Sequence, residues 1–298
     1  MIVLGVDLGA TNTKLVVLHP DDTIQTLEAF PTRGEDGADT VVSRLLGTLN
    51  ALVDAHGAGA IGMGTPGLFD PDTGVVEIFT NLPGQWVGFP LLERLEAGLD
   101  VPVMLINDAR AFTLAEGTLG AGKGSQVMAG LTLGTGIGGG LLIDGKLFHG
   151  ATGSAGEISH QTVDPDGVMC GCGNRGCAEA AARAETLTST AGRATVADVY
   201  EGFAAGDPDC VAAVDRAAAS LGRALGNVIT VFGPDTIVIG GGPATAGGEI
   251  VMEPIRRATF SNVTLVPHDA VRIVRAELGS EAGAIGAALA ARSAQMLD

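Results

Sequence analysis

The chain has 298 residues, enough for one large domain or two of ordinary size, and 46% of them are hydrophobic, which suffices for a substantial core. Its formal net charge of −17 disfavours nonspecific nucleic-acid binding, which needs clustered lysine and arginine. Mean hydropathy is positive, but no stretch reaches the roughly 18 apolar residues of a spanning helix, and the N-terminus lacks the basic region of a signal peptide. We therefore expect a cytoplasmic protein with no membrane or nucleic-acid partner.

The first part of the chain predicts an α/β pattern that opens with a hairpin. Two β-rich runs, 2–7 and 14–18, flank the turn LGATNT, and a run near 24–30 would extend this meander. Apolar residues at helical spacing predict a helix over 38–56. The other elements expected in this part are strands 60–64 and 101–106 and helices 91–97 and 109–119.

The pattern restarts after the glycine-rich segment 120–124. Strands are expected over 127–133 and 138–143, followed by a turn at Asp144-Gly145. The remaining elements expected are helices 177–189, 195–204, 208–231, 247–259 and 281–295 and strands 236–239 and 271–275. Because both parts open with a strand, a turn and a strand, the sequence predicts a duplicated α/β fold, two domains with a cleft between them.

The segment Asp7–Lys14, DLGATNTK, is the first candidate site. A hairpin turn of small residues lets backbone N–H groups approach a phosphate. Asp7 at the end of the strand could hold Mg²⁺ through water, since Mg²⁺ keeps several waters and takes few carboxylates. The alternative is an ordinary tight turn.

The segment Leu131–Gly140, LTLGTGIGGG, is the second candidate site. Its five glycines are more than a turn needs, and glycine is costly within a strand unless a ligand or backbone comes close. It is not a Walker loop, because no GK[ST] follows, and not a dinucleotide fingerprint, because strand sequence follows. The alternative is a glycine-rich bulge without a ligand.

The third candidate site is a metal cluster made by His160, Cys170, Cys172 and Cys177, which are separated by nine, one and four residues. Three thiolates and an imidazole complete a tetrahedral Zn²⁺ shell with no open position, so the metal should be structural. The alternative is a set of reduced cysteines without a metal. Cys210 lies in an expected helix, where it reads as a small buried apolar residue.

The fourth candidate site is the pair Asn107-Asp108 at the carboxyl end of a buried strand, where ligands of open α/β sheets bind. The carboxylate could accept a hydroxyl proton while the amide fixes the substrate. Helix capping by the aspartate is the alternative, since a helix starts at once. Glu157 and Glu179 flank the cysteines, and each is either a ligand-binding group or a surface charge.

Together these residues resemble the ROK family of sugar kinases and repressors, within the actin/hexokinase/Hsp70-like ATPase fold. The resemblance spans nearly the whole chain and is most specific in the block AGE–H–CxCGxxGCxE. Its motifs here are DLGATNTK, IGMGTPGLFDPDTGVV, NLPGQW, ND at 107–108, GTGIGGG, AGEISH, CGCGNRGCAE and IVIGGG. Within the family the chain is most similar to bacterial glucokinases.

The resemblance implies roles for individual residues. It places sugar hydroxyls on Asn107, Asp108, Glu157, His160 and Glu179. Asp108 would be the catalytic base, and His160 would serve both sugar and zinc. ATP phosphates and Mg²⁺ would be surrounded by Asp7, Gly9, Thr11, Asn12, Lys14, Gly134, Thr135, Gly136 and Gly138, and the adenosine would lie near Gly241 and Gly242.

The implied activity is an ATP- and Mg²⁺-dependent hexose kinase, a glucokinase that forms glucose 6-phosphate, with a structural Zn²⁺. Alternatives within the family are kinases of N-acetylmannosamine, fructose or allose, and a polyphosphate-dependent glucokinase. A sugar sensor without turnover is the alternative of another class. The resemblance also implies a homodimer or homotetramer. The expected domains are a small one of residues 1–108, completed by 281–298, and a large one of residues 109–280 that carries the zinc-binding loop.

Overall fold

The computed structural model describes residues 1–79 and 82–295. The chain divides into two compact units, Met1–Ala115 with Glu281–Asp298, and Glu116–Ser280. Asn81, which opens the NLPGQW motif, and residues 296–298 of the expected C-terminal segment lie outside the described residues. In the described part of the chain, none of the helices has the length and apolar character needed to cross a membrane.

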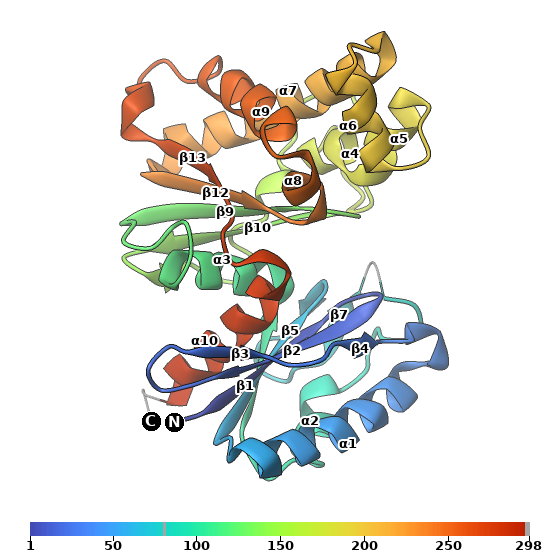
Figure 1. Cartoon of the computed structure of the whole chain (residues 1–298), viewed down its shortest axis with the longest axis vertical. Coiled ribbons are helices and arrows are strands. Elements are labelled where there is room, and N and C mark those ends of the chain that lie inside the picture. Colours follow the sequence, from blue (N-terminus) through green and yellow to red (C-terminus); the bar gives the residue numbers. More distant parts are fainter. Residues whose placement is uncertain (80–81, 296–298) are drawn as a thin grey trace. The chain divides into compact units, whose positions relative to one another are not determined.

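The sheet of the first unit consists of a hairpin followed by parallel strands (Figure 1). β1 (Val3–Leu8) pairs antiparallel with β2 (Asn12–Leu18) and parallel with β5 (Ala60–Thr65). The far edge is formed by β8 (Val103–Asn107), parallel to β5. On the other side, the short β3 (Ile24–Thr26) and β4 (Phe30–Pro31) both pair with β2, so the expected third strand is split in two.

The second unit repeats this arrangement. β9 (Val127–Leu133) pairs antiparallel with β10 (Ile137–Ile143) and parallel with β12 (Thr236–Gly240). β13 (Arg272–Arg275) is parallel to β12, and β11 (Lys146–Leu147) pairs with the end of β10. The strand orders β3-β2-β1-β5-β8 and β11-β10-β9-β12-β13 correspond one to one. The predicted duplication of the α/β fold is thereby confirmed.

The helices follow the predicted order with two differences. The first unit contains α1 (Ala38–His56), α2 (Leu91–Glu96) and α10 (Ala282–Gln295), and α3 (Asp108–Thr118) contains the unit boundary. The helices of the second unit are α4 (Ala178–Ala182), α5 (Ala184–Ala191), α6 (Val196–Ala204), α7 (Pro208–Phe232), α8 (Gly242–Gly247) and α9 (Glu249–Phe260). Short elements not expected from the sequence are β6 (Leu68–Phe69), β7 (Val76–Ile78) and the 3-10 turn η2 (Ile158–His160).

One difference is a break in a helix that the sequence predicted as continuous, and the other is the short helix α8, which the sequence did not predict. The helix expected over 177–189 is interrupted at Arg183, which is extended at ψ 157, and the amide of Ala184 donates to the carbonyl of Gly134 instead. The helix expected over 247–259 begins at Glu249, because Gly248 takes φ 50 and ψ −128 and separates it from α8. A tertiary hydrogen bond causes the break at Arg183, and the conformation of Gly248 sets the start of α9.

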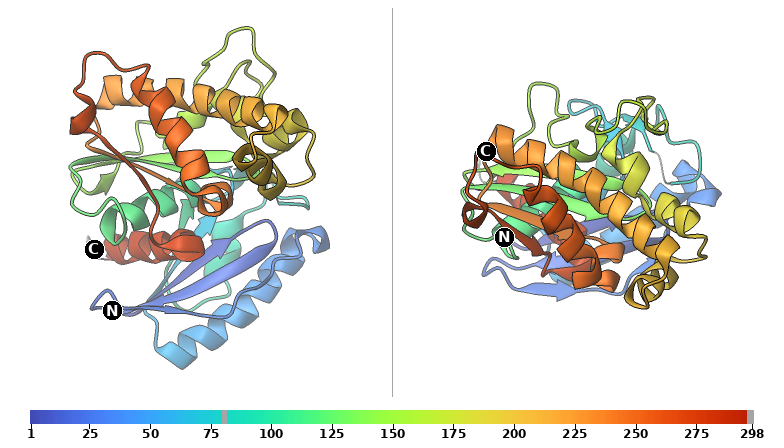
Figure 2. Two further views of the ribbon diagram at one scale, coloured as in Figure 1. Left: turned by 45° about the horizontal axis from the view of Figure 1, so that its top comes forward. Right: turned by 90° about the horizontal axis from the view of Figure 1, so that it is seen from above.

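Successive residues along β1 and β5 point to opposite faces of the first sheet, so the two faces differ in composition. Leu4 and Val6 belong to the same hydrophobic cluster as residues of α1, whereas Gly5 and Gly62 face α10. A Cβ atom at Gly62 would lie 1.8 Å from the carbonyl oxygen of Ala287 in α10. The alanine-rich α10 therefore packs with its backbone against that of the sheet, and α1 covers the opposite face (Figures 1 and 2).

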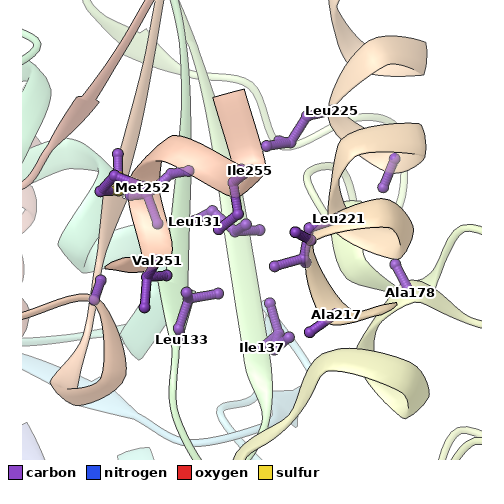
Figure 3. Close-up of a cluster of buried hydrophobic side chains, with 14 of the residues drawn as sticks. Leu131, Leu133, Ile137, Ala178, Ala217, Leu221, Leu225, Val251, Met252 and Ile255 are labelled. Atoms are coloured by element: carbon purple, nitrogen blue, oxygen red, sulfur yellow. The ribbon is translucent and has the colours of Figure 1, made fainter. Parts of the chain in front are cut away.

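The core of the second unit lies between its sheet and the helices α7 and α9 (Figure 3). Leu131, Leu133 and Ile137 of the β9–β10 hairpin point toward Leu221 of α7 and Ile255 of α9. The buried side of the hairpin is therefore fixed by apolar packing up to Ile137, the residue that directly follows the glycine turn.

The contact between α10 and the sheet predicts opposite effects for two Gly→Ala substitutions. Gly62→Ala should lower the free energy of unfolding by about 1–3 kcal/mol, because the added methyl group forces two backbones apart. Gly47→Ala is the matched control: it lies on the exposed side of α1 with no atom within 4 Å of the added Cβ, and should raise stability by up to about 1 kcal/mol. Chemical unfolding of both variants checks this, and equal effects would contradict the packing argument.

Candidate active site

The β1–β2 turn of the first unit is held in one geometry by backbone and hydroxyl contacts. A Cβ atom at Gly9 would lie 2.7 Å from the carbonyl oxygen of Asn12, so the turn requires glycine there. The buried Thr32 donates from Oγ1 to the carbonyl of Gly9 at 2.7 Å and from its amide to the carbonyl of Thr11 at 2.9 Å. Sequence reasoning missed Thr32, since a single threonine in a loop carries no signal.

Asp7, the penultimate residue of β1, is a half-buried carboxylate in the same turn region. Burial raises the pKa of Asp7 to about 6, and the positive charge of Lys14, its partner on β2, lowers that pKa in part. Gly283 in the first turn of α10 leaves room for the carboxylate, because a Cβ there would lie 2.8 Å from Oδ2 of Asp7. The fold therefore keeps a carboxyl group against the end of the hairpin at the cost of a strongly perturbed titration.

Asn107 and Asp108 lie at the same edge of this sheet as Asp7. β1, β5 and β8 are parallel, Asp7 is in register with Gly64, and Thr65 is in register with Asn107. The carboxyl ends of the three strands thus bring these polar residues to one edge, as expected for a ligand site in an open α/β sheet.

Asn107, not Asp108, provides the principal cap of α3. Its Oδ1 accepts the amides of Ala109 and Arg110, both at 3.1 Å, and its Nδ2 donates to the carbonyl of Gly67 at 3.0 Å. Asp108 receives the amide of Ala109 at 2.8 Å and Nδ2 of Asn107 at 3.1 Å, both on Oδ1. These bonds fix the orientation of the half-buried Asp108 carboxylate at the start of the helix.

The turn after β5 also lies at this edge. The sequence analysis did not include this turn in the site. Gly67 has φ +79, and a Cβ there would lie 1.9 Å from the carbonyl oxygen of Ile78. Oγ1 of Thr65 is buried and has no hydrogen-bond partner among the residues that the structure describes. The TPG sequence at 65–67 was the available signal, since it places a forced turn directly beside Asn107.

The glycines of the second unit serve two different purposes. A Cβ at Gly139 would lie 2.6 Å from the carbonyl oxygen of Gly156, and one at Gly241, which has φ +90, would lie 2.0 Å from that of Leu133. These two glycines are therefore required by packing within the chain. At Gly134 an added Cβ would meet only the carbonyl oxygen of Gly136, at 3.5 Å, so packing does not explain that glycine.

His160, Cys170, Cys172 and Cys177 come together as predicted, with ligand atoms all within 4.8 Å of one another. Sγ of Cys170 lies 3.6 Å from Nδ1 of His160, and Sγ of Cys172 lies 3.7 Å from that of Cys177. A tetrahedral zinc ion with ordinary bond lengths has edges of about 3.6–3.8 Å between such ligands. The donor set therefore fits Zn²⁺ in both chemistry and size.

Glu179 connects this cluster to the glycine hairpin. Its Oε1 accepts the amide of Ile137 at 3.0 Å. Its Oε2 lies 3.3 Å from Sγ of Cys170 and 3.6 Å from Nδ1 of His160. Glu157 is half-buried and directly precedes η2, the turn that carries His160. Within the second unit, the predicted sugar and metal residues thus share one neighbourhood with the predicted phosphate hairpin.

Known proteins are similar to this chain along nearly its entire length. The model of the ROK family matches residues 3–294. A glucokinase of Thermotoga maritima is 33% identical over 96% of this chain and 95% of its own. The ROK hexokinase from Thermus thermophilus is 35% identical with a TM-score of 0.90 over 100% of both chains. A ROK family glucokinase from Streptomyces griseus, in complex with glucose and AMPPNP, is 30% identical with a TM-score of 0.83 over 98% of this chain and 100% of its own.

The raised pKa of Asp7 predicts a stability difference that grows with pH. The folded value of about 6 exceeds the ordinary 3.8, so the folded protein binds more protons in this range. The contribution of Asp7 to the free energy of unfolding is fully present below about pH 4 and is lost as the pH rises through about 6. Asp7→Asn should therefore be about as stable as the wild type near pH 3 and up to about 3 kcal/mol more stable near pH 7.5. Chemical unfolding without Mg²⁺ measures this, and an advantage that shrinks with pH would contradict it.

The geometry of the cluster predicts zinc in the purified protein. Elemental analysis should find about one Zn²⁺ per chain, and its removal by a chelator should lower the melting temperature. Burial raises the pKa of the Cys170 thiol to about 12, so metal binding must displace its proton and should weaken in acid. Cys172→Ser should lose the metal, whereas Cys210→Ala, which changes a buried cysteine of α7 outside the cluster, should keep it. Equal zinc contents of these two variants would exclude the cluster as the site.

Proposed function

The chain belongs to the ROK family, and from that premise we propose that it is an ATP-dependent glucokinase, which transfers the γ-phosphoryl group of ATP to the 6-hydroxyl of glucose. The observation that carries the proposal is the carboxylate of Asp108, oriented by Asn107 at the end of β8. A phosphoryl transfer to an alcohol requires a group at the acceptor that takes its proton. The likeness to glucokinases along nearly the full chain supports glucose as the acceptor.

We propose that the sugar binds through half-buried polar side chains, which lie at the end of β8 and around the metal cluster. Such side chains can reach a ligand while the protein shields their hydrogen bonds from water. Asn107 is held by its bonds to α3 and Gly67, and Glu179 is held by Ile137, so neither needs to reorganise when a hydroxyl arrives. The proposed sugar-binding residues are Asn107, Asp108, Glu157, His160 and Glu179.

We propose that the donor phosphates bind at the turn regions of the two hairpins. Gly134 supports this role, because the chain itself supplies no packing reason for a glycine there. The packing roles of Gly9 and Gly241 are compatible with it, since both keep a turn tight beside the proposed ligand. The proposed donor-binding residues are Asp7, Gly9, Thr11, Asn12, Lys14, Gly134, Thr135, Gly136, Gly138, Gly241 and Gly242.

The chemistry of this proposal is a proton transfer joined to an in-line displacement. Asp108 accepts the proton of the 6-hydroxyl while the hydroxyl oxygen attacks the γ-phosphorus. The bond between the γ-phosphorus and the oxygen that bridges it to the β-phosphorus then breaks. Backbone N–H groups of the glycine turns stabilise the charge on the transferred group. Asp7 would hold Mg²⁺ through water, and Mg²⁺ when bound neutralises charge on the phosphates. His160 and the three cysteines would hold Zn²⁺, which keeps the loop folded.

A coupled assay of wild-type protein tests the function directly. Glucose, fructose, allose and N-acetylmannosamine are compared with ATP as donor, and glucose is then compared with polyphosphate as donor. The proposal requires the highest kcat/KM for glucose with ATP. A higher value for another sugar or for polyphosphate would replace the substrate, and binding of glucose without turnover would replace the enzyme by a sugar sensor.

Asp108→Asn should abolish most of the activity. The amide keeps the shape and hydrogen bonds of the side chain but cannot take a proton, so kcat should fall by about a hundredfold to ten-thousandfold. Glucose binding, measured by calorimetry, should change little. Asp100→Asn is the control, an exposed carboxylate of the same unit, and should keep the wild-type kcat. If Asp108→Asn kept more than half of that kcat, Asp108 would have no part in proton transfer.

A further inference from the structure

Ile137 occupies an unusual position in the sheet of the second unit. As the first residue of β10 it lies opposite Leu133 of β9. Within residues 1–79 and 82–295, the strand on the other side of β10 is β11, which pairs with Leu142 and Ile143 at the far end. No strand of this described part covers the outer edge of β10 at Ile137, and backbone groups at such an edge need other partners.

Two side chains take the place of that missing strand. The amide of Ile137 donates to Oε1 of Glu179 at 3.0 Å, and the carbonyl of Ile137 accepts from Oγ of Ser159. Ser159 is fully buried, and the side chain of Ile137 is packed in the core of the unit (Figure 3). Ile137 is thus fixed through its amide, its carbonyl and its side chain at once.

The two side chains belong to separate segments that meet at the metal cluster. Ser159 directly precedes His160, and Glu179 follows Cys177 by two residues. The ligand atoms of His160 and Cys177 lie within 4.8 Å of each other in the cluster. A zinc ion that joins His160 to Cys177 therefore also holds Ser159 and Glu179 on either side of the Ile137 backbone.

We propose that Ser159 and Glu179 are positioning residues through which the metal cluster sets the geometry of the glycine hairpin. Gly134, Thr135 and Gly136 directly precede Ile137, so a shift of Ile137 moves the backbone of the turn. The inference rests on the proposed function for the identity of the ligand at that turn. It makes the binding of the phosphoryl donor, and not only the folding of the loop, dependent on the metal.

The first test removes one of the two hydrogen bonds and leaves the metal ligands intact. Ser159→Ala should bind AMPPNP with Mg²⁺ about 3- to 10-fold more weakly than the wild type in calorimetry, the loss expected for one hydrogen bond, with unchanged zinc content. Thr259→Val is the matched control, because Oγ1 of Thr259 is equally buried and donates to the carbonyl of Ile255 within α9. It should keep the wild-type affinity. Equal affinities of Ser159→Ala and Thr259→Val would overturn the role of Ser159.

The second test follows the amide of Ile137 itself by hydrogen exchange. Chelation of the metal should speed exchange of this amide and weaken AMPPNP binding, and added Zn²⁺ should restore both. Unchanged exchange and unchanged affinity after chelation would overturn the coupling, and this arm decides if Ser159→Ala does not fold. Failure of the wild type to bind AMPPNP would refute the proposed function, whereas exchange at Ile137 would still decide whether the metal controls the hairpin.

Discussion

Two backbones can come into direct contact only where no Cβ atom stands between them, and both units of this protein depend on that constraint. In the first unit Gly5 and Gly62 admit α10, whose carbonyl oxygens would lie within 2.0 Å of a Cβ at either position. In the second, Gly139 admits the carbonyl of Gly156, and Gly241 admits that of Leu133. Glycine at these positions lets the backbones pack closely without large side chains, and at Gly241 this contact lies at the end of a strand.

That rigidity explains why the candidate site can be built from short, polar residues. Thr32 ties the β1–β2 turn, Asn107 ties the start of α3 to the turn at Gly67, and Glu179 ties the β9–β10 hairpin to the metal cluster. Each of these residues bonds to at least one backbone atom, so each fixes a stretch of loop backbone as well as side chains. Groups held in this way lose little entropy when a ligand binds.

The sequence predicts the order of elements well, because strand alternation and helical spacing are local properties. The hairpin that opens each half is visible in this way, and so is the metal cluster, since His160, Cys170, Cys172 and Cys177 have a characteristic spacing. The break at Arg183 and the separate helix α8 were not predicted. The break at Arg183 depends on the hydrogen bond from the amide of Ala184 to the carbonyl of Gly134, 50 residues earlier in the chain. No local pattern reveals such a partner.

Glycine roles were the least predictable part of the site. Gly134, Gly139 and Gly241 look alike in the sequence, where each could serve a phosphate or a tight packing contact. Their roles can be distinguished only from the positions of atoms that are distant in the sequence. Gly139 and Gly241 face carbonyl oxygens, whereas Gly134 faces open space beyond Gly136. The same holds for Ser159 of η2, because its partner is the carbonyl of Ile137 on β10, which is distant in the sequence.

The segment that carries the predicted metal ligands has little apolar packing of its own, so a metal ion bound there would contribute strongly to its folding. Among the described residues, its buried cluster consists of Cys170, Cys177 and Ala180, while Val168 and Met169 are exposed by 59% and 57%. A segment that buries so little apolar surface gains too little free energy to offset the entropy of its ordering. A bound metal ion can supply that difference, because its binding free energy adds to folding. The proposed sugar-binding and hairpin-positioning residues on either side of the loop would then share one source of order, which lies outside the hydrophobic core.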